Sequence, residues 1–299
     1  MTSTTLAPLP VTLAGSADHP AVHATLASLP KYFRLATPTG PISGPISGPT
    51  SGPTSGPTSG ATSGPTSGVV TAVPTLAALR AALAARPSGI LLTGGTAGEP
   101  GGSPLGEVTT AVRELAERAA AARVPVVVAG PWALDPAVTA LAGALDAEDA
   151  SLIEVTATVP AGSHPAGVLL DQLALLRTAI APARAVEVIQ ADGHGHLAHA
   201  LVGDVPVHLA AAVSGLGTRR ARLDVLGPAV QWRLSFPDPA TARPATVVRT
   251  DADGERLLPT RYESACRAAW RHLHAAVTEG AAPPYSLSEL ADDLALLNA

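Results

Sequence analysis

The segment 192–199 holds the densest group of potential metal ligands in the chain: Asp192, His194, His196 and His199, with His208 shortly after. In an extended strand His194 and His196 would share a face, at a spacing that suits a divalent cation. The glycines between them indicate a turn instead, and histidines at a strand edge are common without a metal. We therefore predict no metal site, with metal binding at these histidines as the open alternative.

Other groups that carry covalent or nucleophilic chemistry are scarce. Lys31 is the only lysine, and Cys266, the single cysteine, lies in a stretch with a helical pattern. One cysteine forms neither an internal disulfide nor a cysteine-built zinc site, and a small buried apolar role is favoured for it over that of a nucleophile. The sequence has no Gly-x-Ser-x-Gly elbow after a strand and no phosphate-binding loop that ends in Gly-Lys-Ser/Thr. A reaction that needs a lysine must therefore use Lys31.

The overall composition excludes several classes of partner. Hydrophobic residues make up 46% of the 299 residues, charged residues 14%, and the formal net charge is -5. The arginines are scattered, so no basic stripe exists to neutralise a phosphate backbone, and we expect no nucleic-acid partner. No apolar run reaches about 18 residues, and the first residues lack the pattern of a signal peptide. We expect a cytoplasmic protein without a membrane partner.

The elements that would position a site alternate between apolar strands and helices in the first 150 residues. The expected strands are 11–15, 32–36, 69–73, 89–95 and 124–130, and the expected helices are 21–29, 76–85, 107–123 and 137–145. Thr75 and Asp135 are predicted N-caps, the latter followed by Pro136 in the first turn. Such alternation is typical of a parallel sheet covered on both faces. We predict an α/β fold with a Rossmann-like, doubly wound domain over residues 1–150.

A repeat of Gly, Pro, Ser and Thr with a period of four residues interrupts this domain at residues 42–68. Its residues offer nothing to bury, so nothing offsets the entropy lost on ordering them. We therefore expect a disordered insertion in a surface loop.

From Ser151 onward strands dominate. Segments 151–159, 184–191, 196–202, 205–215, 220–227 and 229–236 are expected strands, and segment 164–180 is an expected helix. Near the end of the chain Ser286 and Glu289 form a predicted capping box, with Tyr285 and Leu290 as its hydrophobic staple. This pattern predicts an α+β domain with a largely antiparallel sheet over residues 151–299, with the C-terminal helices packing back on the domains.

Three segments occur in the order that is found in one family of enzymes. They are VPVVVAGPWALDPA at 124–137, GVLLDQLALLR at 167–177 and EGAAPPYSLSELADDLALL at 279–297. They resemble the Gfo/Idh/MocA family's strand with its Glu-Lys-Pro turn, its helix with the active-site aspartate and histidine, and its closing acidic helix. The resemblance covers nearly the whole chain outside the repeat. It implies an NAD- or NADP-dependent oxidoreductase fold acting on sugar-like or cyclitol-like substrates.

The resemblance also shows which catalytic groups are replaced. Ala129 and Gly130 stand in the Glu and Lys places before Pro131, and neither side chain can donate a hydrogen bond or carry charge. Lys31 follows the first expected helix, at the end of the sheet opposite to the strand ends where ligands bind in such folds. We therefore expect that the usual lysine chemistry is absent.

The resemblance implies that Asp171 stands in the place of the family's aspartate. The family's histidine, three residues earlier, is missing, and the nearest histidine is His164 in the preceding loop. We name Asp171 and His164 as candidate catalytic residues. The alternatives are an ordinary helix aspartate, solvated or paired with Arg177, and a surface-loop histidine.

The nucleotide-binding pattern is also reduced. Dinucleotide binding uses a Gly-x-Gly-x-x-Gly turn after the first strand, and here only Gly15 of that turn is kept, followed by Ser16 and by Asp18. Candidate cofactor contacts are therefore Gly15 and Ser16, the turn with Thr93 and Gly94, and Pro131. Tight turns without a ligand are the alternative.

Two hypotheses remain open at this point. In the first, the chain is an active NAD(P)-dependent oxidoreductase that uses Asp171 and His164. In the second, it is a non-catalytic relative that binds a small-molecule ligand or serves as the partner of an active paralogue, and the missing lysine, histidine and glycines favour this hypothesis. The family commonly pairs through the outer face of the C-terminal sheet, so the resemblance implies a homo-oligomer or a hetero-oligomer.

Overall fold

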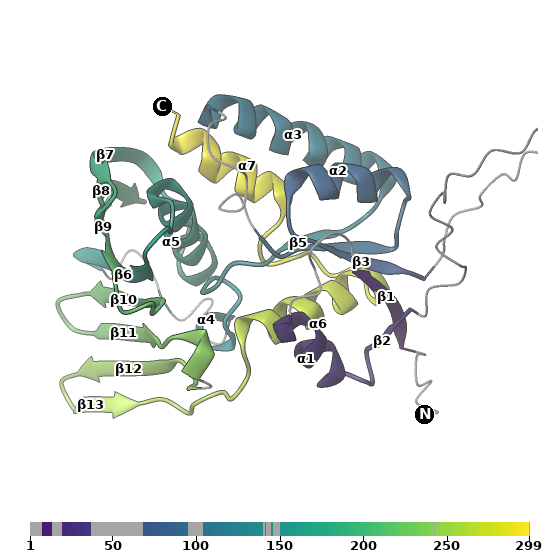
Figure 1. Cartoon of the computed structure of the whole chain (residues 1–299). Helices are drawn as coiled ribbons and strands as arrows, with labels where there is room; N and C mark the ends of the chain where they lie inside the picture. Colours follow the sequence, from purple (N-terminus) through teal and green to yellow (C-terminus); the bar gives the residue numbers. More distant parts are fainter. Residues whose placement is uncertain are drawn as a thin grey trace, which may run out of the picture.

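The computed structural model describes residues 8–13, 20–36, 68–94, 104–139, 141, 145, 150–241 and 243–298. Two sheets lie side by side, with helices around the first of them (Figure 1). The first sheet is parallel throughout, in the order β2-β1-β3-β4-β5. Its strands are β1 (Leu9–Leu13), β2 (Phe33–Leu35), β3 (Val70–Val73), β4 (Gly89–Leu92) and β5 (Val126–Val128).

Helices cover both faces of this sheet, as its apolar strands require. α2 (Leu76–Ala84), α3 (Leu105–Ala122) and α7 (Leu287–Leu296) lie on one face, and α1 (Pro20–Ala27) and α6 (Ala265–Thr278) lie on the other (Figure 1). The last two helices of the chain therefore pack against the sheet made by its first residues. Within the described residues no helix is long and apolar enough to cross a membrane.

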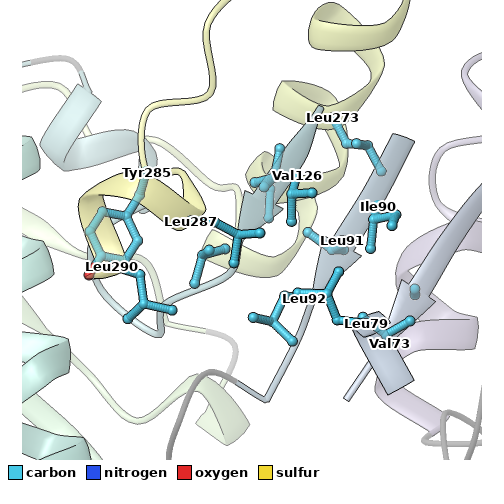
Figure 2. Packing of buried hydrophobic residues seen from close by; sticks show 14 of the residues in the cluster. Val73, Leu79, Ile90, Leu91, Leu92, Val126, Leu273, Tyr285, Leu287 and Leu290 are labelled. Atoms are coloured by element: carbon cyan, nitrogen blue, oxygen red, sulfur yellow. The ribbon is translucent and has the colours of Figure 1, made fainter. Parts of the chain in front are cut away.

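The core of this half joins β4 and β5 to the two C-terminal helices, as Figure 2 shows. Ile90, Leu91 and Leu92 are fully buried, with Leu273 of α6 packed in the same cluster. α6 approaches so closely that a Cβ at Gly89 would lie 2.6 Å from the Val277 side chain. Glycine at the start of β4 is therefore required by packing.

The second sheet has eight strands in the order β13-β12-β11-β10-β6-β9-β8-β7. Its strands are β6 (Leu152–Pro160), β7 (Arg184–Asp192), β8 (Gly195–Val202), β9 (Val205–Ser214), β10 (Arg220–Leu226), β11 (Gln231–Phe236), β12 (Thr246–Asp251) and β13 (Gly254–Leu257). Only β6 and β9 pair in parallel. Helix α5 (Pro165–Ala179) packs on one face. The predicted fold class, a parallel doubly wound sheet followed by a largely antiparallel α+β region, is confirmed.

The predicted side-chain caps of α2 and α7 are confirmed by their hydrogen bonds. Thr75 caps α2 by accepting a bond from the Ala78 amide at 3.2 Å, and Ser286 and Glu289 form the capping box of α7. The strands β12 and β13 were not predicted, although the Asp253-Gly254 pair, where β13 begins, is a hairpin signal and Gly254 has a φ of 107°.

Two predicted segments extend beyond what the structure describes. Helix α4 is described over Pro136–Thr139, whereas the predicted helix continues to residue 145, where only residues 141 and 145 are described. The repeat at 42–68 lies outside the described residues except for Gly68.

Candidate functional site

A cleft of about 780 Å³ lies at the carboxyl ends of β4 and β5, next to α5. One wall consists of the turns after these strands, with Thr93 and Gly94 after β4 and residues 129–132 after β5. The other consists of α5, the loop before β10, the loop after β11 and the segment that leads into α6. Parallel α/β sheets bind ligands at this end of their strands. The position and size of the cleft therefore make it the candidate functional site.

Asp171 lies in this cleft and forms an ion pair with Arg219 from the loop before β10. The guanidinium Nη1 is 3.0 Å from the carboxylate Oδ2, and the two side chains are 21% and 30% exposed. Burial raises the pKa of Asp171 to about 7, although the charge of Arg219 and its hydrogen bond lower it. The carboxyl group can therefore exchange a proton near neutral pH. The sequence did not predict Arg219 as its partner, and the alternative of pairing with Arg177 is wrong.

Arg177 is instead bound to Asp293 of α7, which joins α5 to the closing helix. The guanidinium Nε lies 3.1 and 3.2 Å from the two carboxylate oxygens of Asp293, whose side chain is 1% exposed. The Tyr285 hydroxyl donates a further bond of 2.9 Å to the same carboxylate. Because Asp171 lies on α5, this buried network fixes the helix that carries it.

A second acidic group lies in the cleft at the start of α4. The Asp135 carboxylate accepts a bond of 2.8 Å from the Ala137 amide, as predicted for an N-cap. Burial raises the pKa of Asp135 to about 6, and the negative charge of Glu263 adds to this rise. Glu263 also lines the cleft and is paired with Arg271 at 3.0 Å. The cleft thus contains three carboxyl groups, those of Asp135, Asp171 and Glu263.

His164 does not line this cleft. It occupies the residue before α5, with its side chain exposed, and borders a separate hollow of about 280 Å³. It lies seven residues before Asp171 on the same helix, a rise of about 10 Å along the axis. The structure therefore brings Asp171, but not His164, to the cleft wall.

The structure describes three of the five candidate cofactor residues. Thr93, Gly94 and Pro131 line the cleft, whereas Gly15 and Ser16 lie outside the described residues. The Thr93 hydroxyl donates to the Val73 carbonyl at 3.2 Å. A Cβ at Gly94 would lie 1.9 Å from the Pro74 carbonyl oxygen, so packing within the chain requires this glycine. The turn after β1, where dinucleotide-binding folds hold the diphosphate, lies outside the described residues.

The turn after β5 leaves room for a Cβ atom at Gly130. The Ala129 amide donates to the Leu92 carbonyl at 2.8 Å, which continues the pairing of the sheet. A Cβ at Gly130 would meet the Ala133 Cβ at 3.5 Å, an ordinary contact. A larger side chain therefore fits at this position. Lys31, exposed and just before β2, lies at the other end of the parallel sheet.

The histidines of the metal hypothesis do not converge. His196 is buried against α5, where its Nε2 is 2.7 Å from the Gln172 side-chain oxygen, and burial lowers its pKa to about 4. His194 is in the turn before β8, and its amide donates to Asp192 at 2.7 Å. Elsewhere His199 stacks on His208 with ring centres 4.9 Å apart. Among the residues that the structure describes, no three His, Cys, Asp or Glu side chains are placed to hold a metal ion.

Two further residues that line the cleft are Trp132 and Cys266. Trp132 is 1% exposed and belongs to the apolar core of the second half, so its ring cannot stack on a ligand. The Cys266 thiol accepts a weak hydrogen bond from Thr25, and burial raises the pKa of this thiol. A protonated thiol is a poor nucleophile, which agrees with the structural role that the sequence favours.

Sequence reasoning missed the residues that the loops deliver to the cleft. These are Arg219, Arg243, Tyr262 and Glu263. Tyr262 is 84% exposed at the cleft, which is unusual for so large an aromatic side chain. No local pattern marks these positions, because the loops that carry them come together only in the folded chain.

Comparisons with known proteins agree with this architecture. UDP-N-acetylglucosamine 3-dehydrogenase GnnA from Acidithiobacillus ferrooxidans superposes with a TM-score of 0.58 at 15% identity, over 77% of this chain and 76% of that one. KijD10, a 3-ketoreductase from Actinomadura kijaniata solved with TDP-benzene and NADP, superposes with a TM-score of 0.59 at 13% identity, over 78% and 77%. An oxidoreductase from Agrobacterium radiobacter, solved with NAD+, L-tartaric acid and magnesium, gives 0.54 at 12%, over 77% and 75%.

No protein-family model matches the sequence, and no curated protein matches it by sequence. The similarity therefore lies in the fold, which this chain shares with these oxidoreductases.

Proposed function

We propose that this chain is a non-catalytic relative of these oxidoreductases that binds a small polar ligand in the cleft. The observation that carries the proposal is the turn after β5, where Ala129, Gly130 and Pro131 face the cleft without a lysine. Lys31, the only lysine in the sequence, lies at the opposite end of the sheet, so no lysine side chain reaches the cleft. Among the described residues, no other lysine can take the place of the one that is missing from this turn.

The wall formed by α5 and the loops supplies the groups that bind the ligand. The ion pair of Asp171 and Arg219 offers both an acceptor and donors, and Asp135 and Glu263 offer further carboxylates. Such a set suits the hydroxyl groups of a sugar-like or cyclitol-like molecule, since each hydroxyl both donates and accepts. Tyr262 adds an exposed ring at the side of the cleft.

One observation favours an active NAD(P)-dependent oxidoreductase as the second candidate. The pKa of Asp171 is about 7, which is the range that a general acid or base requires at neutral pH. Asp171 would then hold or accept the proton of a substrate hydroxyl, with Arg219 orienting its carboxylate. A bound NAD or NADP would supply the hydride chemistry.

As a partner we propose a second subunit, either a copy of this chain or an active paralogue. Glu154, His199 and His208 share one face of the eight-stranded sheet by register, and their exposure beside buried neighbours places this face opposite the one covered by α5. Figure 1 shows α5 on one side of this sheet. Among the described residues no helix packs on that outer face. A sheet face of this extent is suited to pairing with another subunit.

The test is a titration of the purified protein with NADH and NADPH, and separately with a panel of sugars and cyclitols. Nicotinamide fluorescence and thermal shift report binding, and absorbance at the nicotinamide band reports turnover. The proposal expects a thermal shift with a sugar or cyclitol and no turnover with any nicotinamide cofactor. Asp171→Asn should weaken ligand binding about tenfold, because it loses a charged acceptor.

Asp192→Asn is the matched control, since Asp192 lies at the exposed end of β7, outside the cleft. It should leave ligand binding unchanged. Turnover of any sugar or cyclitol that is abolished in Asp171→Asn would replace the proposal with the active oxidoreductase. Absence of binding by every ligand and cofactor would direct the search to the partner subunit.

A further inference from the structure

A second hollow, of about 440 Å³, lies beside the cleft at the outer face of the eight-stranded sheet. Arg243, between β11 and β12, lines both of them. Three arginines border the second hollow, Arg220, Arg222 and Arg243, whereas Asp238 is the only carboxylate among its lining residues. The chain as a whole has a formal net charge of -5, so this group of arginines differs in sign from the molecule's overall charge.

The register of the sheet explains why these groups share a face. Arg220 is paired with Thr158, and Arg222 is paired with Thr156 on one side and with Ser235 on the other. Because side chains alternate along a strand, residues paired directly across the ladder point to the same face. Two guanidinium groups and a row of hydroxyl groups are therefore presented together.

Arg222 is held in place by Asp224, whose side chain is 7% exposed. Its Nε and Nη2 both bind the Asp224 carboxylate, Nη2 at 2.9 Å, so the guanidinium fork is oriented and Nη1 is left for a ligand. Arg233 binds the same carboxylate at 3.0 Å. The negative charge of Asp224 is thus shared by two arginines.

The other two arginines of the hollow carry unbalanced charge. Within the described part of the chain neither Arg220 nor Arg243 forms an ion pair. The Asp238 carboxylate is engaged by the Arg219 amide at 3.3 Å. Because Asp224 balances the charge of Arg222, the guanidinium groups of Arg220 and Arg243 face one lining carboxylate, that of Asp238, which leaves the hollow positive.

We infer that this hollow binds the phosphoryl group of a small phosphorylated molecule. Guanidinium groups match the oxygens of a phosphate with paired hydrogen bonds, and neighbouring hydroxyls complete its coordination. A volume of about 440 Å³ exceeds what a single phosphate fills, so the organic part of the molecule occupies the remainder. The site does not rest on ligand binding in the cleft, and because it lies on the sheet face proposed for a second subunit, the oligomeric state is measured alongside phosphate affinity.

The test is a calorimetric titration of the full chain with inorganic phosphate, sulfate, glucose 6-phosphate and, as a carboxylate, acetate. We expect saturable binding of phosphate, tighter binding of glucose 6-phosphate and no binding of acetate. Arg220→Gln and Arg243→Gln should each weaken phosphate binding about tenfold, since each removes a charge-assisted contact. Arg220→Lys, which keeps the charge but loses the fork, should bind phosphate with intermediate affinity.

Arg118→Gln on the exposed face of α3 is the matched control, because it removes one charge at a distance from the hollow. It should leave phosphate binding unchanged. Equal weakening by all three Gln variants, or no saturable binding by the wild-type chain, would overturn the inference. A change of oligomeric state in the Arg220 and Arg243 variants with unaltered phosphate affinity would also overturn it, and would assign these arginines to an interface. Binding of NADH to the cleft is measured in parallel, so that failure of the proposed function is seen separately.

Discussion

The wall of the cleft that follows β4 and β5 offers small, uncharged residues, whereas the wall that α5 and the loops form offers ionised ones. On the first, the Thr93 hydroxyl and the backbone at Gly94 are engaged within the chain. On the second, Asp171 and Arg219 form a partly exposed ion pair. The fold therefore places a site at the expected strand ends, but only the second wall has the chemistry to recognise a polar ligand. The fold of this molecule therefore determines where its site lies but not what the site recognises.

Breaking the connection between α5 and α7 should have the largest effect, because this connection holds the helix that carries Asp171. Asp293→Ala leaves the Arg177 guanidinium without its partner in a buried position, and removes the acceptor of the Tyr285 hydroxyl. We expect the free energy of unfolding to fall by about 3 to 5 kcal/mol, measured by urea denaturation. Asp292→Ala is the control, since the neighbouring Asp292 is exposed and should change stability by less than about 0.5 kcal/mol. Similar losses in both variants would contradict a structural role of the network.

The pH dependence of stability tests the burial of Asp171. Its folded pKa of about 7 lies above the ordinary value of an aspartate, so the folded state binds the proton more tightly than the unfolded state does. Stability should therefore decrease as the pH rises from about 4 to about 7, by at most a few kcal/mol. Asp171→Asn should remove this slope. An unchanged pH profile in the variant would show that the carboxyl titrates at its ordinary value.

The sequence predicted the elements better than the site because the two depend on different information. Helix caps such as Thr75 and Ser286 follow from residues a few positions apart, and these were correct. Asp171 was found because its helix resembles a known one. Its partner Arg219 is 48 residues further along the chain, and no local pattern connects the two.

Glu263 tests whether the acidic groups of the cleft act on one another. Glu263→Gln removes a negative charge near Asp135, so the pKa of Asp135 should fall from about 6 toward the ordinary value of an aspartate. NMR titration of labelled aspartate carboxyls measures this shift. The loss of pairing with Arg271 should cost about 1 kcal/mol or less, because the arginine side chain is 47% exposed. A pKa of Asp135 that does not move would mean that burial alone raises it.

Gly130→Lys sharpens the difference between the two walls by placing a charge on the uncharged one. The space at Gly130 accepts a Cβ at an ordinary distance from Ala133, so we expect stability to change by less than about 0.5 kcal/mol. An ammonium group in the cleft should lower the pKa of Asp171 below about 7, because an opposite charge favours the carboxylate. Gly106→Lys, at a glycine in α3 with open space around it, is the matched control and should leave that pKa unchanged. If Gly130→Lys also leaves it unchanged, the turn after β5 does not face Asp171, and the missing lysine cannot explain an absence of catalysis.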